Sequence, residues 1–582
     1  MSTSFVTAAA TARRRVVRSR PALLWTTLQR PAWVARIVFL VGFVTVVSAV
    51  LPGMRERMHL VNEMVPDAFP AAATTGAAAV GVMLVLLSRG LRRGKRRAWL
   101  LALVLSALAA VLHLLKGLAV EEAMLCLGVL ALLLSARDRF TARPDPRSMH
   151  RLAIVVTLGP VVATALGYLW LTLDDGGQAP GTTFTDRVVQ AAWGLVGVPG
   201  PVHYVVPGGA DRSAAALAVL GAAVLVLALL VALQPASGPH PLTPLERRRV
   251  RDVLDRWGQV DSLSYFSLRE DRSALFSTSG KAAVTYRVVG TVSLAAGDPL
   301  GDPEAWPGAI EAWLAEARSY GWVPAVLGTS ERGAAAYHQA GLEVLELGDE
   351  AVLHTHDFTL EGRHMRGVRQ AVSRCAGAGI TVTCQRITDV DPEVLRCARE
   401  RADSWRDGSV ERGFSMALGR FGDPRDDRNF LALARDARGE LVGLLSFVPW
   451  GPDGLSLDLM RRDRDAENGV IEMMVAQLMH DAPALGVARV SLNFAVFRSV
   501  FARGERLGAG PALRAWRAVL LWASRFWQIE SLYRANAKYR PEWVPRYIAY
   551  QSTSCLPRVA TAALRAEAFL VAPAWLRRIG KP

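Results

Sequence analysis

Six apolar segments within the first 235 residues constrain the fold of this chain more than any other feature of its sequence. Each is close to the ~20 residues that an α-helix needs to cross the hydrocarbon core of a bilayer. The segments cover residues 34–51, 71–88, 98–115, 120–136, 152–171 and 213–233. The sequence therefore predicts a multispan α-helical membrane domain of about six helices over residues 1–235.

Positive charges gather in alternate loops of this half. Lys and Arg are abundant before the first segment, between the second and third, between the fourth and fifth, and after the sixth. Because cytoplasmic loops carry the excess of Lys and Arg, we expect both ends of this half in the cytosol. The apolar stretch 188–206 is interrupted by glycine and proline, so we expect an interfacial or re-entrant segment there and not a seventh span.

Beyond residue 235 the sequence changes to charged residues mixed with short apolar runs. Thr243, Pro244 and Glu246 mark a helix start, with a capping threonine, a proline in the first turn and a glutamate that completes a capping box. Strand and helix patterns then alternate in two similar series. The simplest account is a pair of tandem α/β subdomains, at 236–360 and 361–582.

The densest polar cluster of this half is the segment 456–472, "SLDLMRRDRDAENGVIE". Strand alternation places Ser456 and Asp458 on one face, and Arg461 follows at the strand end. A helix is predicted to open near Asn468, with Glu472 in its first turn. A strand end, cations and a helix N-terminus suit an anion. A hairpin edge with solvated charges is the alternative, but a carboxylate in an apolar strand needs a partner.

A second cluster, 526–550, interleaves cations with aromatic residues in "FWQIESLYRANAKYRPEWVPRYIAY". Tyr533, Lys538, Trp543 and Arg546 are its candidate binding residues. Such mixtures suit phosphate contact combined with stacking. An amphipathic C-terminal helix whose cations reach solvent explains the pattern equally well.

Three weaker signals complete the survey. The glycine-punctuated segment 411–423, "ERGFSMALGRFGD", contains Arg420 but indicates little alone. His354 and His356 form an H-x-H pair with no third ligand evident, so a packing role is favoured over a metal site. The five cysteines include no C-x-x-C pair, so neither a disulfide framework nor zinc is expected.

These segments, in this order after a multispan region, resemble the phosphatidylglycerol lysyltransferase family, also called multiple peptide resistance factors. The matching segments are "ERGFSMALGRF", "SLDLMRR", "NGVIE", "LNFAVF" and "YRANAKYRPEWVPRY". The likeness is greatest to the branch that is fused to a lysyl-tRNA synthetase. The chain ends at Pro582, so we expect no synthetase module here, and no additional spans of the kind linked to lipid flipping.

The resemblance implies two acetyltransferase-like folds in tandem, which pass an aminoacyl group from aminoacyl-tRNA to a hydroxyl of phosphatidylglycerol. The enzyme would lie in the bacterial inner membrane with its catalytic half in the cytoplasm, and a separate synthetase would supply the charged tRNA. Lysyl transfer is favoured, with alanyl transfer or another glycerolipid acceptor as alternatives. The cationic product would lower susceptibility to cationic peptides. No cofactor or metal is expected because the tRNA ester is already activated, and the oligomeric state is open.

The formal net charge of +16 agrees with two anionic substrates. Within this interpretation Asp458 accepts or orients the proton of the lipid hydroxyl, and Arg461 holds a phosphate or stabilises the oxyanion. Glu472 neutralises an ammonium group. The expected substrate-binding residues are Arg420, Ser456, Asn468, Asn493, Tyr533, Lys538, Trp543 and Arg546.

Two rival functions remain. An acyl-CoA-dependent membrane transferase would need an R-x-x-G-x-G/A loop that opens a helix. Arg374, Gly377 and Gly379 have that spacing, but they lie at the end of a predicted helix, where glycines usually cap. A transporter or lipid-binding scaffold is the second rival, and it gives no reason for a carboxylate in an apolar strand.

Overall fold

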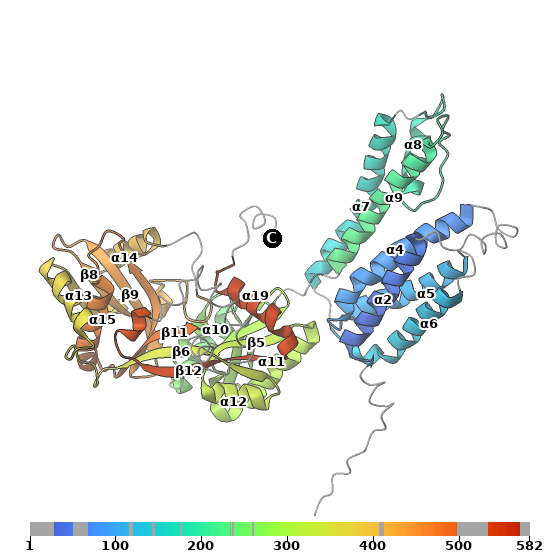
Figure 1. Ribbon diagram of the computed structural model, residues 1–582. Coiled ribbons are helices and arrows are strands. Elements are labelled where there is room, and N and C mark those ends of the chain that lie inside the picture. Colours follow the sequence, from blue (N-terminus) through green and yellow to red (C-terminus); the bar gives the residue numbers. More distant parts are fainter. Residues whose placement is uncertain are drawn as a thin grey trace, which may run out of the picture. The chain divides into compact units, whose positions relative to one another are not determined.

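The computed structural model describes residues 28–50, 68–115, 120–142, 146–174, 177–232, 234, 238–258, 261–406, 413–496 and 534–570. They belong to two compact units (Figure 1). The first comprises Met1–Ala236 with Ser319–Gly321, and the second Ser237–Arg318 with Trp322–Pro582.

Helices occupy all the segments predicted to span the membrane. They are α2 (Pro31–Val50), α4 (Ala68–Leu91), α5 (Arg96–Leu115), α6 (Val120–Ser135), α7 (Pro146–Leu173) and α9 (Gly209–Ala232). Among the described residues, 4 helices are long and apolar enough to cross a membrane, namely α2, α5, α7 and α9. The apolar part of α4, Gly76–Leu91, and the 16 residues of α6 are shorter.

Close backbone approach joins α2 to α4. A Cβ added to Gly42 would lie 2.9 Å from the carbonyl oxygen of Gly81, and a Cβ on Gly81 would meet the Gly42 carbonyl at the same distance. Small residues let membrane helices pack this tightly. The short helix α8 (Phe184–Gly194), capped by Thr183, packs against α7 and α9. Its 11 residues are too few to cross a bilayer, in agreement with the expected interruption.

The second unit is built on one 12-stranded mixed sheet in the order β1-β2-β3-β5-β12-β6-β11-β10-β9-β8-β7, with β4 beside β2. The strands are β1 (Ser273–Phe276), β2 (Ala282–Val289), β3 (Val292–Ala296), β4 (Leu300–Gly301), β5 (Val323–Thr329), β6 (Glu343–His354), β7 (Thr381–Arg386), β8 (Phe430–Arg435), β9 (Leu441–Trp450), β10 (Gly454–Arg462), β11 (Arg489–Val496) and β12 (Glu542–Tyr550). The helices are α10 (Pro244–Trp257), α11 (Trp306–Tyr320), α12 (Glu331–Gln339), α13 (Arg366–Gly377), α14 (Pro392–Ser404), α15 (Val470–Asp481) and α19 (Leu556–Ala566). The alternative of a C-terminal amphipathic helix is therefore wrong for residues 542–550, which form β12.

One element order occurs twice along this sheet. Strands β1, β2 and β3 form an antiparallel meander, α11 follows, and β5 then pairs parallel to β3. Strands β8, β9 and β10 form a second antiparallel meander, α15 follows, and β11 pairs parallel to β10. The expected order of a helical unit followed by an α/β unit with a tandem series is confirmed.

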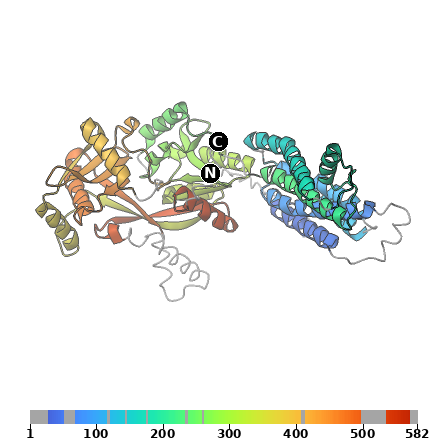
Figure 2. The ribbon, with the colours of Figure 1, turned by 90° about the horizontal axis from the view of Figure 1, so that it is seen from above.

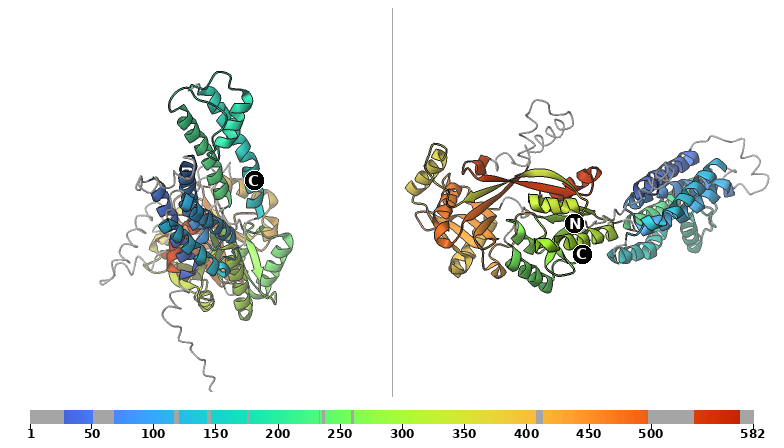
Figure 3. Two further views of the ribbon diagram at one scale, coloured as in Figure 1. Left: turned by 90° about the vertical axis from the view of Figure 1, so that its right-hand side faces the viewer. Right: turned by 90° about the horizontal axis from the view of Figure 1, so that it is seen from below.

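The two halves of the sheet exchange a strand. β6, from the first series, pairs with β11 of the second, whereas β12, from the end of the second, pairs with β5 of the first. β6 and β12 also pair with each other, and β12 appears in red through the middle of the sheet in Figures 2 and 3. The predicted boundary at residue 360 falls in the connection after β6, but neither range on its own holds a complete half of the sheet.

Alternation along β8 supplies two cores on opposite faces of the second half. Phe430, Ala432 and Ala434 pack into a core with α13 and α15. Leu431 and Leu433 pack instead against α14. The face covered by α14 is the one that carries the candidate site.

Candidate active site

A β-bulge in β10 lies at Asp458. The pairing of β10 with β9 shifts between Leu457 and Leu459, so Asp458 is the extra residue. In a regular strand, Asp458 and Arg461 would point to opposite faces because three positions separate them. Both nevertheless line the same cavity, together with Leu459. The bulge therefore brings together the two residues predicted to do the chemistry.

The cavity has a volume of about 250 Å³ and a mainly charged wall. Its charged lining residues are Arg399, Asp403, Arg406, Arg420, Asp458 and Arg461. Four guanidinium groups and two carboxylates line the wall, and Arg420 is paired with Asp426 outside the lining, so a smaller positive balance remains, which suits an anionic ligand. Asp403 pairs with Arg406 at 3.3 Å, and Arg399 donates to the Gly422 carbonyl.

Asp458 is almost buried, with 9% of the residue's surface exposed. Its Oδ1 accepts a hydrogen bond of 2.7 Å from the backbone N–H of Leu418. Leu418 belongs to the glycine-punctuated segment 411–423, which indicated little in the sequence alone and of which the structure describes residues 413–423. This segment also supplies Ala417, Gly419 and Phe421 to the cavity wall, so it forms one side of the site.

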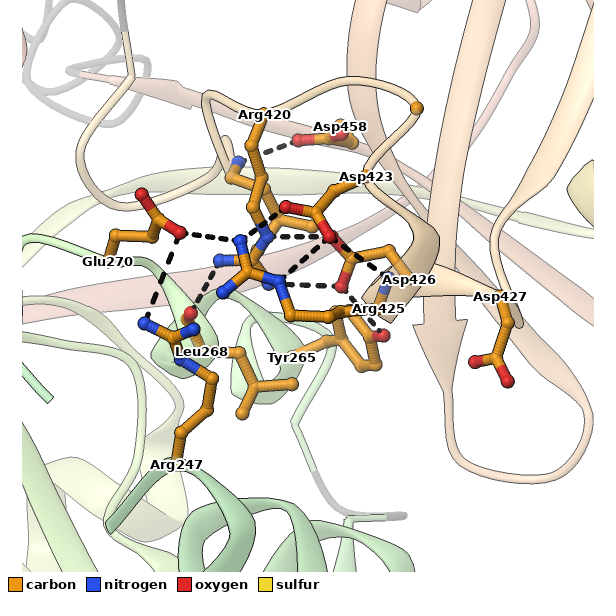
Figure 4. Close-up of polar contacts among 12 residues, drawn as sticks. Arg247, Tyr265, Leu268, Glu270, Arg420, Asp423, Arg425, Asp426, Asp427 and Asp458 are labelled. Atoms are coloured by element: carbon orange, nitrogen blue, oxygen red, sulfur yellow. Dashed lines mark hydrogen bonds and ion pairs between the residues drawn. The ribbon is translucent and has the colours of Figure 1, made fainter. Parts of the chain in front are cut away.

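Arg420 is fixed by protein partners. Its guanidinium donates to Asp426 at 2.7 and 3.0 Å and to the Leu268 carbonyl at 2.6 Å, as Figure 4 shows. Tyr265 donates its hydroxyl to the same Asp426 at 3.1 Å. Burial, and then the neighbouring Asp426 charge, raise the pKa of Tyr265. Arg420 thus lines the cavity and also links the segment that carries Asp426 to the Leu268 turn that precedes β1.

Glu472 and Lys538 form an ion pair, although they are 66 residues apart. Glu472 lies in the first turn of α15, as predicted. The backbone carbonyl of Asn468, just before that helix, accepts from Arg374 at 2.6 Å, and Arg374 also pairs with Glu467 at 3.1 Å. Neither Glu472 nor Lys538 lines the cavity at Asp458.

Ser456, on the same strand as Asp458, and Asn493, on the neighbouring β11, do not line the cavity. Ser456 is fully buried on β10. Asn493 has a φ of 69° on β11 and donates from its amide nitrogen to the Leu457 carbonyl at 2.6 Å. Trp543, on β12, packs against the core of the second half. Tyr533 lies outside the described residues.

Arg546 sits in a buried ionic network and not in the cavity. Its guanidinium donates to Asp261 at 2.6 Å, to Ser262 at 2.6 Å and to Glu350 at 2.9 Å. All of these side chains are buried. Asp298 lies nearby, where burial and then the charge of Asp261 raise its pKa to about 6. These contacts favour a structural role for Arg546, and its predicted contact with phosphate stays a prediction.

Each histidine of the H-x-H pair lies beside a carboxylate. His354 Nε2 lies 2.6 Å from Glu542, and His356 Nε2 lies 3.1 Å from Asp357. The described residues contain no group of three or more His, Cys, Asp or Glu side chains that could hold a metal ion.

Sequence reasoning missed the contribution of α14 to the cavity. Arg399 and Asp403 lie four residues apart on one side of α14, and Arg406 follows just after the helix ends at Ser404. That spacing was readable in "RERADSWR", but nothing local indicated that the strand carrying Asp458 lies opposite.

Two protein families match the sequence of this chain. The family described as "Phosphatidylglycerol lysyltransferase, C-terminal" matches residues 251–550, and "Transmembrane region of lysyl-tRNA synthetase" matches residues 27–233. The second match and the apolar helices make the chain a membrane protein.

Among similar proteins is the lysylphosphatidylglycerol biosynthesis bifunctional protein LysX of Mycobacterium avium (strain 104), 42% identical over 93% of this chain and 47% of the relative. The protein of the same name from Mycolicibacterium gilvum (strain PYR-GCK) is 41% identical over 98% of this chain and 52% of the relative. The chain thus spans about half the length of these relatives. L-PGS from Bacillus licheniformis, a solved structure, is 23% identical, with a TM-score of 0.49 over 57% of this chain and 97% of that one. Because the first match covers more than half of the sequence, the chain belongs to the phosphatidylglycerol lysyltransferase family.

Proposed function

We propose that this protein transfers an aminoacyl group, lysyl in the first place, from aminoacyl-tRNA to phosphatidylglycerol at the inner leaflet of the bacterial membrane. The observation that carries the proposal is the nearly buried Asp458 carboxylate in a cavity lined by four arginines. The relatives that bear the name of lysylphosphatidylglycerol biosynthesis support the lysyl group and the lipid acceptor.

The reaction is a transesterification, and the site has the groups that it needs. A glycerol hydroxyl of the lipid attacks the ester carbonyl of the aminoacyl-tRNA, and Asp458 takes the hydroxyl proton. Arg461 stabilises the negative charge that develops on the carbonyl oxygen. The new ester bond forms to the lipid oxygen, the bond to the ribose oxygen of the tRNA breaks, and the proton passes to that leaving oxygen.

The anionic lipid headgroup is held beside Asp458 by Arg399 of α14 and by Arg406, which follows that helix. Arg399 and Arg406 line the same cavity as Asp458, and a phosphate diester prefers such planar donors. The tRNA remains on the cytosolic side, where the distribution of Lys and Arg predicts the catalytic unit to lie. A separate synthetase would charge that tRNA.

An acyl-CoA donor is the second candidate, and the structure gives it little support. Arg374 lies at the C-terminal end of α13, and its guanidinium is engaged by Glu467 and the Asn468 carbonyl. A pyrophosphate site would instead need a helix N-terminus at this loop. The R-x-x-G-x-G spacing therefore marks a helix end in this chain.

The test is the lipid product. Membranes containing the chain should convert phosphatidylglycerol to an aminoacylated lipid when charged tRNA is supplied, and mass spectrometry identifies the amino acid. RNase should abolish the product, and acyl-CoA should not restore it. A product that forms without tRNA, or no product from either lysyl- or alanyl-tRNA, would refute the proposal.

A further inference from the structure

The segment 413–418 reaches Asp458 through one backbone hydrogen bond, and a remote carboxylate holds that segment. Glu567 follows α19, far from the cavity in sequence. Its Oε2 accepts from the Phe414 N–H at 2.6 Å, and its Oε1 accepts from the N–H and the hydroxyl of Ser415 at 3.0 and 2.6 Å. Hydrogen bonds to an ionised carboxylate are the strong kind, so three of them fix the start of the segment.

Two arginines of the first half bind the same segment through its carbonyl groups. Arg269 donates to the Gly413 carbonyl at 2.6 Å and to the Ala417 carbonyl at 2.7 Å. Arg272 donates to the Phe414 carbonyl at 2.7 Å, and its guanidinium lies 4.5 Å from the centre of the Phe414 ring. The two carbonyls that accept from Arg269 are four residues apart, so the segment is held near both of its ends.

The burial of Arg272 has a cost that its hydrogen bond to the Phe414 carbonyl helps to offset. The side chain is fully buried, and burial lowers its pKa to about 10. A buried cation is costly unless its donors are used, and Arg272 also donates to the Thr285 hydroxyl at 3.2 Å. An apolar residue would fill the same space at lower cost, but it could not hold the Phe414 carbonyl.

We propose that Glu567 is a positioning residue for the transfer reaction. Together with Arg269 and Arg272 it holds segment 413–418, so that the Leu418 amide fixes the Asp458 carboxylate. This inference rests on the proposed function. The chain of contacts runs from Glu567 to Phe414 and Ser415, along the backbone to Leu418, and from there to Asp458. The end of the chain, around α19, thereby controls the geometry of a carboxylate on β10.

The first test compares Glu567→Gln with Glu440→Gln, in full-length protein in membranes. Glu440 makes an exposed ion pair with Arg401, so its variant makes the same chemical change away from the site. We expect Glu567→Gln to lower kcat about 10- to 100-fold with both KM values within about twofold of wild type, because a misplaced catalytic group slows the step and not binding. The control should retain wild-type kcat. Wild-type kcat in Glu567→Gln would overturn the inference.

A double variant separates positioning from general damage. In an Asp458→Asn background, Glu567→Gln should change the residual rate less than about twofold, because its effect passes through Asp458. Losses that multiply would overturn the inference. Ser415→Ala, which removes only the hydroxyl bond, should cause a smaller loss with the same non-additivity, and it serves where Glu567→Gln does not fold.

Hydrogen exchange tests whether Glu567 holds segment 413–418, without relying on activity. Glu567→Gln should speed amide exchange in a peptide that covers residues 413–418 and leave that of β10 unchanged. Unchanged exchange at 413–418 would refute the inference that Glu567 holds this segment, whatever the activity of the variant. Absence of any aminoacylated lipid from wild type would instead refute the proposed function, so the two failures are distinguishable.

Discussion

Replacing Arg546 with methionine tests whether this arginine holds the fold together or binds substrate. The substitution keeps much of the side-chain volume and removes the charge. It leaves the carboxylates of Asp261 and Glu350 buried without their cation, since both are under 3% exposed. Removing one partner of a buried ion pair costs about 3–5 kcal/mol. We therefore expect a loss of stability of that size.

The assay is thermal unfolding of the detergent-solubilised chain, followed by tryptophan fluorescence. For a unit of this size, 1 kcal/mol moves Tm by roughly 2–4 °C, so the expected loss of about 3–5 kcal/mol lowers Tm by about 6–20 °C. Arg396→Met is the matched control, because Arg396 pairs with Glu393 and Glu400 on the exposed face of α14. Such surface pairs contribute about 0–1 kcal/mol.

Adding Glu350→Gln to Arg546→Met should recover part of the loss, because one uncompensated charge disappears. A Tm for Arg546→Met within about 2 °C of the control would refute the reasoning. If such a stable variant also showed a raised KM for aminoacyl-tRNA or lipid, Arg546 would be a substrate-binding residue, as the sequence predicted.

Three further predictions concern the site and its surroundings. Arg406→Ala should raise the KM for phosphatidylglycerol several-fold with little change in kcat, since it removes positive charge from the cavity wall. Rates in vesicles of varied phosphatidylglycerol content give this KM, and an unchanged value would show that Arg406 does not bind the lipid. Glu472→Gln breaks the ion pair with Lys538 and should reduce lysyl transfer more than alanyl transfer, whereas equal losses would separate Glu472 from amino-acid choice. Burial and the charge of Asp261 raise the pKa of Asp298 to about 6, so the folded chain binds this proton more tightly than the unfolded chain. The stability that this group contributes therefore falls as pH rises from about 4 to about 6. Asp298→Asn should flatten that part of the curve of Tm against pH, and an unchanged slope contradicts the assignment.

The elements that depend on local sequence were predictable. The capping box at Thr243 and Glu246 is present, with the threonine hydroxyl accepting from the Glu246 N–H at 3.2 Å. The apolar segments became helices for the same reason, because the length and composition of a single segment decide whether it can cross a bilayer. The strand that carries Asp458 was likewise readable from its apolar neighbours.

The geometry of the site was not predictable, because it depends on pairing between distant segments. The bulge at Asp458 exists only in relation to β9, and no residue within β10 signals it. Arg546 looked like a phosphate ligand among aromatic residues, but its partners Asp261 and Glu350 lie 285 and 196 residues away. The exchange of β6 and β12, which creates that buried network, leaves no local pattern in the sequence.

The role of Asp458 is the central claim, and the rate of Asp458→Asn in membranes supplied with lysyl-tRNA and phosphatidylglycerol tests it most directly. Asparagine keeps the shape of the side chain and an oxygen that can accept from the Leu418 amide, but it cannot take a proton. We predict a loss of kcat of about 100-fold or more with normal expression and membrane insertion. A variant that forms aminoacylated lipid at the wild-type rate would contradict the mechanism.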